Sequence, residues 1–199
     1  MIDPSEVSAV IVTKGDNEST LARIRESLSM FAEVLVWDNS QSINRKVYGR
    51  YVAALNAFSE YIYTQDDDCL VDARKLFGMY QPGELLCNML PSHQPFYAAT
   101  GGISLVGWGA IFPKALIDFS AYLANYPEDE LFDRECDRIF TWLNRSRTRI
   151  VDIGVGHLPH AHGADRMGME SRHGNDLAEI RHRLAVIYEL YGIPRLTAV

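Results

Sequence analysis

The chain has 199 residues, of which 47% are hydrophobic and 23% charged, and its formal net charge is -7. This composition predicts a folded globular domain with one buried core, and the negative charge disfavours a broad nucleic-acid-binding surface. No apolar run approaches the roughly 18 residues of a membrane span, so we expect a cytoplasmic protein, of a bacterium or, for a virus, of the host cell. Its three cysteines, Cys69, Cys87 and Cys136, are too scattered for a disulfide framework.

Strand and helix patterns alternate in residues 7–66. β-branched and apolar residues predict three buried strands, and residues at helical spacing predict two amphipathic helices between them. The strands are Val7–Thr13, Glu33–Trp37 and Glu60–Gln65, and the helices carry Leu21, Ile24, Leu28 and Phe31, then Val47, Tyr51, Leu55 and Phe58. This alternation predicts a parallel sheet that gathers ligands beyond the carboxyl ends of its strands. Thr13, Asp38 and Asp66 fall on that edge.

The second half of the chain is less regular. Gly107 and Gly109 interrupt an apolar segment, which indicates a bulge or a close approach of the backbone to a ligand. The segment Gly154–Gly174 is too long for a simple connection, and we interpret it as a lid that orders when ligand binds. The predicted strands are Glu84–Met89, Ile103–Phe112 and Arg149–Ile153, and the predicted helices begin at Pro113, run from about Glu130 to Asn144, and begin near Asn175 with Leu177, Ile180, Leu184, Ile187 and Tyr191 on one face.

Three consecutive aspartates, Asp66, Asp67 and Asp68, follow the third predicted strand. Carboxylates crowded at the end of a buried strand repel one another, and a bound cation relieves this repulsion. Hard oxygen ligands suit Mg2+ or Mn2+, which bind substrate phosphates alongside one or two carboxylates. The alternative is a solvated acidic turn that caps the next helix. The position directly after a strand favours a metal site held by Asp68 with help from Asp66.

Several motifs, in order along the chain, resemble those of a known family. They are Val36-Trp-Asp-Asn-Ser40 at the end of the second strand, Asn44-Arg45 in the following loop, the aspartate triplet, and Glu135-Cys-Asp137 in a later helix. This set resembles the exostosin-like family of GT-A type glycosyltransferases. The resemblance implies an α/β fold of the GT-A (Rossmann-like) type, a mixed sheet flanked by helices in a single domain, 1–199. It also implies a nucleotide-binding half at residues 1–72 and an acceptor and catalytic half at residues 84–199.

The resemblance implies an enzyme that transfers a sugar from a nucleoside-diphosphate sugar in a metal-dependent reaction. A UDP-sugar is the first choice of donor, and the anomeric configuration is expected to be retained. Such a transfer requires that charge on the leaving diphosphate be neutralised and that positive charge on the sugar be stabilised. A guanidinium matches phosphate oxygens in bidentate fashion, and polar groups at the strand ends can hydrogen-bond the base or the ribose. The expected nucleotide-sugar ligands are Thr13, Asp38, Asn39, Asn44, Arg45, Arg50, Asp66 and Arg181.

The resemblance also suggests residues for the reacting centre. Asp137 matches the aspartate of the family's Cys-Asp pair, and Glu135 is the second choice, because residues two apart on a helix do not share a face. Arg138 departs from the family, which has a second aspartate at that position. The remaining assignments are Asp67 facing the donor sugar, His173 as a metal contact beside Asp68, and Trp108 with Gly107 as a stacking surface for the acceptor.

Two other interpretations stay open. His157, His160, His162 and His173 lie close together in the sequence, and with the aspartates they suit a transition metal, as in a metallohydrolase. A non-catalytic nucleotide-sugar-binding module would need the arginines but not Asp137. The acceptor classes are a glycan, a protein hydroxyl and a hydroxymethylated base of viral DNA. We further expect the C-terminal helix to pack on the sheet and to direct Arg181 towards the diphosphate.

Overall fold

A six-stranded sheet forms the centre of the computed structural model, which describes residues 2–15, 18–99, 102–158 and 173–191. The strand order is β2-β1-β3-β6-β5-β7, and β1, β2 and β3 are mutually parallel, as the alternating pattern predicted. Thr13 pairs with Asp38, and Val12 pairs with Asp66. The polar strand ends therefore meet at one edge. These strands are β1 (Val7–Thr13), β2 (Glu33–Asp38) and β3 (Tyr61–Asp66).

The second half of the chain completes the sheet with a change of direction. β6 (Ala110–Pro113) runs antiparallel between β3 and β5 (Leu85–Asn88), and β7 (Thr148–Val151) pairs with β5 in parallel. Two further strands, β4 (Cys69–Leu70) and β8 (Gly156–His157), form a separate antiparallel ladder. This small ladder joins the segment that follows the aspartates to the segment that follows β7.

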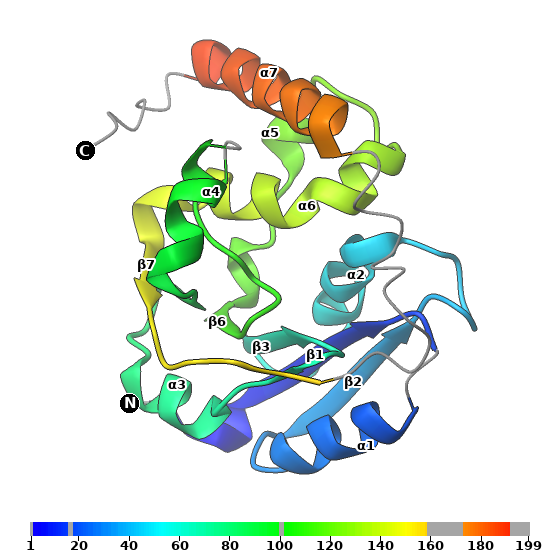
Figure 1. Cartoon of the computed structure of the whole chain (residues 1–199), viewed down its shortest axis with the longest axis vertical. Helices are drawn as coiled ribbons and strands as arrows, with labels where there is room; N and C mark the ends of the chain where they lie inside the picture. The colour runs from blue at the N-terminus through cyan, green and yellow to red at the C-terminus, as the bar shows by residue number, and fades with distance from the viewer. Residues whose placement is uncertain (1, 16–17, 100–101, 159–172, 192–199) are drawn as a thin grey trace.

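Helices cover both faces of the sheet because alternate strand residues face opposite sides. Val10, Ile62 and Phe112 pack in one core cluster with residues of α2 and α6, whereas Ile11 and Tyr63 pack in a second cluster with residues of α1 and α3. Figure 1 shows this layering. The α-helices are α1 (Glu18–Ser27), α2 (Gly49–Leu55), α3 (Ala73–Met79), α4 (Gln94–Ala99), α5 (Ser120–Leu123), α6 (Glu130–Leu143) and α7 (His173–Tyr191). Short 3-10 helices occur at Pro4–Glu6, Lys46–Tyr48, Pro91–His93, Lys114–Leu116 and Arg145–Arg147.

The strand predicted at Ile103–Phe112 is much shorter in the structure, where β6 begins only at Ala110. Val106 and Gly107 are buried in the preceding loop, so their apolar character reflects burial and not strand pairing. Gly109 has a positive φ of 99°, which ends regular strand geometry at that point. The helix predicted after Pro113 is likewise broken, into the 3-10 turn at Lys114–Leu116 and the short α5.

The C-terminal helix α7 packs on other helices and not on the sheet, contrary to the prediction. It contacts α6 and α5, and Figure 1 shows it on the outer side of α6. Its buried residues Ile180, Leu184 and Ile187 are three of the apolar residues that the sequence placed on one face. The apolar face was therefore identified, but its partner was not, because periodicity does not reveal what covers a helix.

Candidate functional site

The first part of the site is the edge formed by the ends of β1 and β2. The Thr13 hydroxyl accepts a hydrogen bond from the Gly15 N–H at 3.0 Å, and the Thr13 carbonyl accepts one from the Asn39 N–H at 2.9 Å. The Asp38 carboxylate accepts bonds from the Ser40 N–H and hydroxyl at 2.8 and 2.7 Å. These bonds fix the two turns side by side at the edge where the sequence predicted nucleotide binding.

The loop after β2 uses its asparagines to hold its own backbone. The Asn39 side-chain oxygen accepts bonds from Trp37 Nε1 at 3.0 Å and from the Arg45 N–H at 2.9 Å, and its amide donates to the Lys46 carbonyl. Asn44 accepts from the Lys46 N–H at 3.1 Å, beside the positive φ of 48° at Lys46. Both asparagines therefore shape the loop, and contacts from them to a nucleotide remain predictions.

Arg45 links this loop to α6. Its guanidinium pairs with Glu128 and lies 3.1 Å from an Asp133 carboxylate oxygen, and it stacks 4.8 Å from the Tyr48 ring centroid. Burial raises the pKa of Asp133 to about 6, and the nearby Glu128 adds to this rise, although Arg45 opposes it. The arginine that the sequence assigned to the diphosphate is thus already engaged by two carboxylates.

A buried ion network of Arg50, Tyr51, Asp66 and Asp137 joins the strand edge to α6. Arg50 is 1% exposed, with its Nη2 2.5 Å from Asp66 Oδ1 and its Nε 3.5 Å from Asp137 Oδ1. The Tyr51 hydroxyl donates to the same Asp137 oxygen at 2.8 Å. Burial raises the pKa of Asp137, while Arg50 acts in the opposite direction. Arg50 therefore compensates two carboxylates from a buried position, and its predicted contact with the diphosphate stays a prediction.

Glu135 and Asp137 face different surroundings, as their spacing on a helix predicted. Glu135 is 3% exposed, and it accepts a 2.8 Å bond from Arg138 Nε. The Arg138 guanidinium in turn lies over the Tyr97 ring, 4.6 Å from its centroid. Of the two carboxylates predicted at the reacting centre, Asp137 is therefore the one that the structure brings to Asp66.

The loop before β6 closes on the end of β3. The Asp66 N–H donates to the Gly107 carbonyl at 2.7 Å, and a Cβ at residue 107 would lie 2.0 Å from an Asp66 carboxylate oxygen. Glycine is therefore required at this close approach. The Trp108 ring is flanked edge-on by the rings of His93 and His157, with centroid distances of 4.6 and 5.2 Å. This contact brings the predicted acceptor-stacking residue beside the third part of the site.

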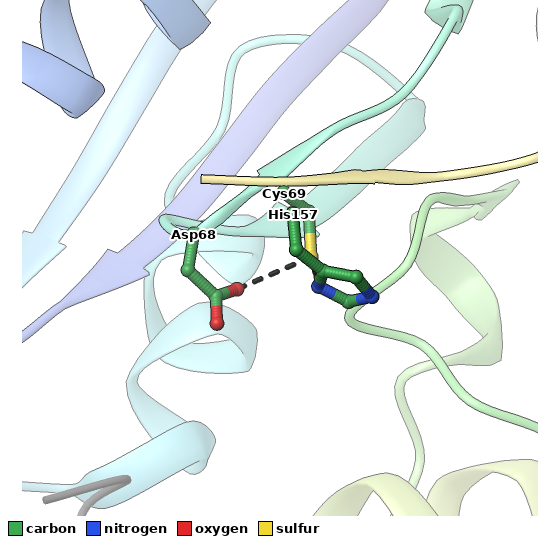
Figure 2. A group of neighbouring side chains, drawn as sticks. All are labelled: Asp68, Cys69 and His157. Atoms are coloured by element: carbon green, nitrogen blue, oxygen red, sulfur yellow. Dashed lines mark hydrogen bonds between the residues drawn. The ribbon is translucent and has the colours of Figure 1, made fainter. Parts of the chain in front are cut away.

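That third part consists of three side chains that could hold a metal ion, Asp68, Cys69 and His157, which we call the metal group (Figure 2). One ligand atom from each residue lies within 4.8 Å of the others, and in the described part of the chain no other trio of such residues is as close. The Cys69 thiol donates to Asp68 Oδ1 at 3.1 Å and lies 4.0 Å from His157 Nδ1. The carboxylate and the imidazole fit a divalent cation, and the exposure of His157 leaves one side open to water or phosphate.

Cys69 was not predicted as a site residue, and His157 was predicted as a metal ligand only in the metallohydrolase alternative. A signal for Cys69 was its position directly after the triplet, but pairing between β4 and β8 was required to bring His157 opposite it. Asn88 was missed too: it is 1% exposed, and its amide donates to the carbonyls of Trp108 and Gly154, each at 2.9 Å. These bonds join the Trp108 loop to the chain leading into β8.

Several predicted residues are not brought to this site. Arg181 is exposed on α7, and its contact with a diphosphate stays a prediction. Asp67 lies half-buried in the turn between β3 and β4. His160, His162, most of the predicted lid and the side chain of His173 lie outside the described residues.

Known structures with a similar fold include sugar-transferring enzymes. One is glucosyl-3-phosphoglycerate synthase from Mycobacterium tuberculosis, in complex with Mn2+, uridine-diphosphate and glucosyl-3-phosphoglycerate. The similarity covers 95% of this chain and 81% of the synthase chain, with a TM-score of 0.57 and 14% identity. Its complex with Mg2+ and uridine-diphosphate gives the same TM-score of 0.57. S. aureus TarS 1-349 in complex with UDP-GlcNAc matches 92% of this chain, which spans 66% of the TarS chain, with a TM-score of 0.55 and 15% identity. No family model and no curated protein sequence matches the chain.

These comparisons confirm the predicted fold class and leave the predicted family unsupported. None of them supports the exostosin-like family that the sequence motifs suggested. In the described part of the chain, every helix is too short or too polar to cross a membrane. The chain has a mixed α/β fold of the GT-A glycosyltransferase type, in one small domain.

Proposed function

We propose that this protein is a metal-dependent glycosyltransferase that moves a sugar from a nucleoside-diphosphate sugar to an acceptor hydroxyl with retention of configuration. A UDP-sugar is the first donor to test. The observation that carries the proposal is the metal group directly after β3, beside the edge that holds Thr13, Asp38 and Asp66. Similar folds were solved with Mn2+ or Mg2+ and UDP, and with UDP-GlcNAc. Open α/β sheets bind ligands outside the carboxyl ends of their strands, which is where this group lies.

The metal ligands in this proposal are Asp68 and His157, and the ion is Mn2+ or Mg2+. When bound, the ion supplies neutralising charge for the departing diphosphate. Asp66 is less suited as a ligand than the sequence suggested, because its Oδ1 is held by Arg50 at 2.5 Å. Arg50 therefore positions Asp66 and Asp137 from below, while Asp38 at the strand edge is the proposed contact for the base or ribose.

Asp137 is the proposed carboxylate at the reacting centre. Its side chain is 21% exposed, and it is held in place by the Tyr51 hydroxyl and by Arg50. A negative group fixed in this way stabilises positive charge that develops on the sugar, without needing to reorganise during the reaction. Trp108, half-buried and flanked by two histidine rings, is the proposed acceptor-facing surface for a glycan, a protein hydroxyl or a modified DNA base.

A metallohydrolase is the second candidate, because Cys69 and His157 are also residues that bind Zn2+ in hydrolytic enzymes. A donor screen that measures release of nucleoside diphosphate, with and without an acceptor mixture, separates the two. A transferase releases diphosphate from one sugar donor, and the acceptor increases the rate. Hydrolysis of phosphate or acyl esters with no reaction of any sugar donor would favour the hydrolase.

The binding site itself is tested by calorimetric titration of UDP in the presence of Mn2+. Asp68→Asn should abolish the metal-dependent part of UDP binding while the fold, followed by circular dichroism, is retained. The matched control is Glu26→Gln, which removes the charge of an exposed carboxylate on α1 and should leave UDP affinity unchanged. Equal affinity in the wild type and in Asp68→Asn would contradict the proposed site.

A further inference from the structure

The metal group contains a sulfur ligand as well as the oxygen and nitrogen ligands that the proposed function uses. Cys69 pairs directly opposite His157 in the ladder of β4 and β8, and the Leu158 N–H donates to the Asp68 carbonyl at 2.7 Å. The backbone therefore fixes all three residues relative to one another. Figure 2 shows their side chains converging on one side of the two strands. Cys69 is fully buried, whereas Asp68 is half-buried and His157 exposed.

The two distances from the Cys69 sulfur lie near those expected around a tetrahedral ion. Bond lengths of about 2.3 Å to sulfur and about 2.0 to 2.2 Å to nitrogen or oxygen place neighbouring ligand atoms roughly 3.4 to 3.6 Å apart. In the structure, Cys69 Sγ lies 3.1 Å from the Asp68 oxygen and 4.0 Å from the His157 nitrogen. These two distances lie on either side of the tetrahedral spacing, and all three ligand atoms lie within 4.8 Å of one another, so side-chain rotations would have to bring them to a common ion. Three protein ligands with one open position is the arrangement of a catalytic metal site and not of a closed structural one.

The other two cysteines show what a structural thiol looks like in this chain. Cys136 is buried in α6, and its thiol donates to the Asp133 backbone carbonyl at 3.6 Å. Cys87 is buried on β5, which lies between β6 and β7 in the sheet. Among the residues that the structure describes, neither belongs to a close trio of metal-binding side chains, whereas Cys69 has a carboxylate and an imidazole as neighbours.

We propose that Cys69 is the third protein ligand of the metal, bound as a thiolate beside Asp68 and His157, and that the site therefore prefers thiophilic ions in the order Zn2+ and Co2+, then Mn2+, then Mg2+. The thiol releases its proton to solvent as the sulfur–metal bond forms. The net charge of the occupied site is therefore one unit less positive than it would be with a protonated thiol. This inference rests on the proposed function only for the presence of a divalent ion after β3. Thiolate ligands select zinc-like ions, whereas Mg2+ prefers oxygen ligands and water.

The test is a titration of the full-length chain with Co2+, with a thiol-free reductant present. Binding should produce the near-ultraviolet absorption band of a thiolate–cobalt bond in the wild type, and also in the matched controls Cys87→Ala and Cys136→Ala. Cys69→Ala should lose this band. Its affinity for Zn2+ should fall by more than the roughly 10- to 100-fold that loss of a residue outside the ligand shell costs, while Mn2+ affinity changes less.

Two further variants keep the test decisive if Cys69→Ala does not fold. Asp68→Asn and His157→Ala change less buried side chains, and each should weaken the cobalt band. Cobalt binding that depends on Asp68 but shows no thiolate band would overturn the role of Cys69 and leave the proposed metal site intact. A thiolate band without Mn2+-dependent binding of UDP would support the role of Cys69 and overturn the proposed function instead.

Discussion

The buried ion network includes Asp66 and the metal group begins two residues later, at Asp68. The two regions nevertheless differ in how their charged and polar groups are arranged. In the network, Arg50 is 1% exposed, and its charge is matched by Asp66 and Asp137. In the metal group, Asp68 and Cys69 face the exposed imidazole of His157, and the three side chains present an oxygen, a sulfur and a nitrogen atom close to one another. The charges of the network are paired with one another inside the protein, whereas the three side chains of the metal group are those that could together hold an ion.

This difference suggests that the network positions the site and that the metal group binds the ion. Buried charges need fixed partners, and removal of one partner leaves the other uncompensated. The network therefore holds the end of β3 and α6 in one relative position. The metal group is open on one side and can exchange water for phosphate oxygens. Rigidity next to an open ligand site is what preorganised electrostatic catalysis requires.

Replacement of Arg50 should have the largest effect, because it breaks the network at its centre. Arg50→Met leaves the Asp66 and Asp137 carboxylates without their buried partner, and we expect it to lower the free energy of unfolding by about 3–5 kcal/mol. Urea denaturation followed by circular dichroism measures this loss. The matched control is Arg149→Met, which removes a half-exposed arginine paired with Glu84 and should cost no more than about 1 kcal/mol.

The same variant sharpens the comparison between the two regions. If they are separable, folded Arg50→Met should retain the cobalt spectrum of the metal group, since the three residues that could hold the ion are Asp68, Cys69 and His157 and do not include Arg50. Equal unfolding free energies for Arg50→Met and the wild type would show that the network does not hold the fold together. Loss of the cobalt spectrum in a folded variant would show that the two regions act as one.

The next prediction separates catalysis from binding. Asp137→Asn keeps the shape of the side chain and an oxygen that accepts from Tyr51, but it removes the negative charge. We expect kcat to fall by about two decades, with the KM of the donor nearly unchanged, because a group that acts on developing charge contributes mainly to the transition state. Steady-state kinetics with the donor found in the screen measure both constants.

Glu135→Gln is the control for this prediction, since it removes a carboxylate charge two residues away on the same helix. Glu135 is paired with Arg138 in a buried position, so its replacement should reduce stability while leaving kcat of the folded enzyme unchanged. A large fall in kcat for Glu135→Gln, together with normal turnover of Asp137→Asn, would reverse the assignment of the two carboxylates.

The sequence was sufficient to predict the parallel half of the sheet and the edge at which polar residues gather. Alternating strand and helix patterns determine the strand directions, and strand ends then place Thr13, Asp38 and Asp66 together. The position of Asp137 relative to Glu135 also followed from helical spacing. These are properties of local pattern and connection, which a single sequence carries.

Contacts between distant segments were not predictable in the same way. Pairing of Cys69 with His157 depends on a ladder of two strands, each only two residues long, which has no periodic signal. Burial of Arg50 was not predicted because an arginine in a helix is usually exposed. Two carboxylates, from β3 and α6, compensate its charge in the buried position. The packing of α7 on α6 depends on which apolar faces remain uncovered after the sheet has formed.

The smallest expected effect on stability concerns the ion pair of Arg45 and Asp133, which links the loop after β2 to α6. Asp133 lies one helical turn before Asp137, and its pKa is raised to about 6 by burial from an ordinary value of 3.8. A carboxyl with a raised pKa binds its proton more tightly in the folded protein than in the unfolded chain. Its contribution therefore makes the protein most stable below pH 3.8, and stability is lost as the pH rises through the window from 3.8 to about 6.

Asp133→Asn should remove this part of the pH dependence. One pKa unit corresponds to about 1.4 kcal/mol, and solvent screening at a partly exposed site reduces the whole effect to about 1 kcal/mol. Urea unfolding at several pH values across the window should show a shallower fall of stability with pH in the variant than in the wild type. Asp118→Asn, at an exposed carboxyl whose pKa is lowered by Ser120, is the control and should not flatten the fall. Parallel curves for the wild type and Asp133→Asn would mean that Arg45 keeps Asp133 ionised, and the Arg45–Asp133 pair would then be a permanent charge pair between the loop and α6.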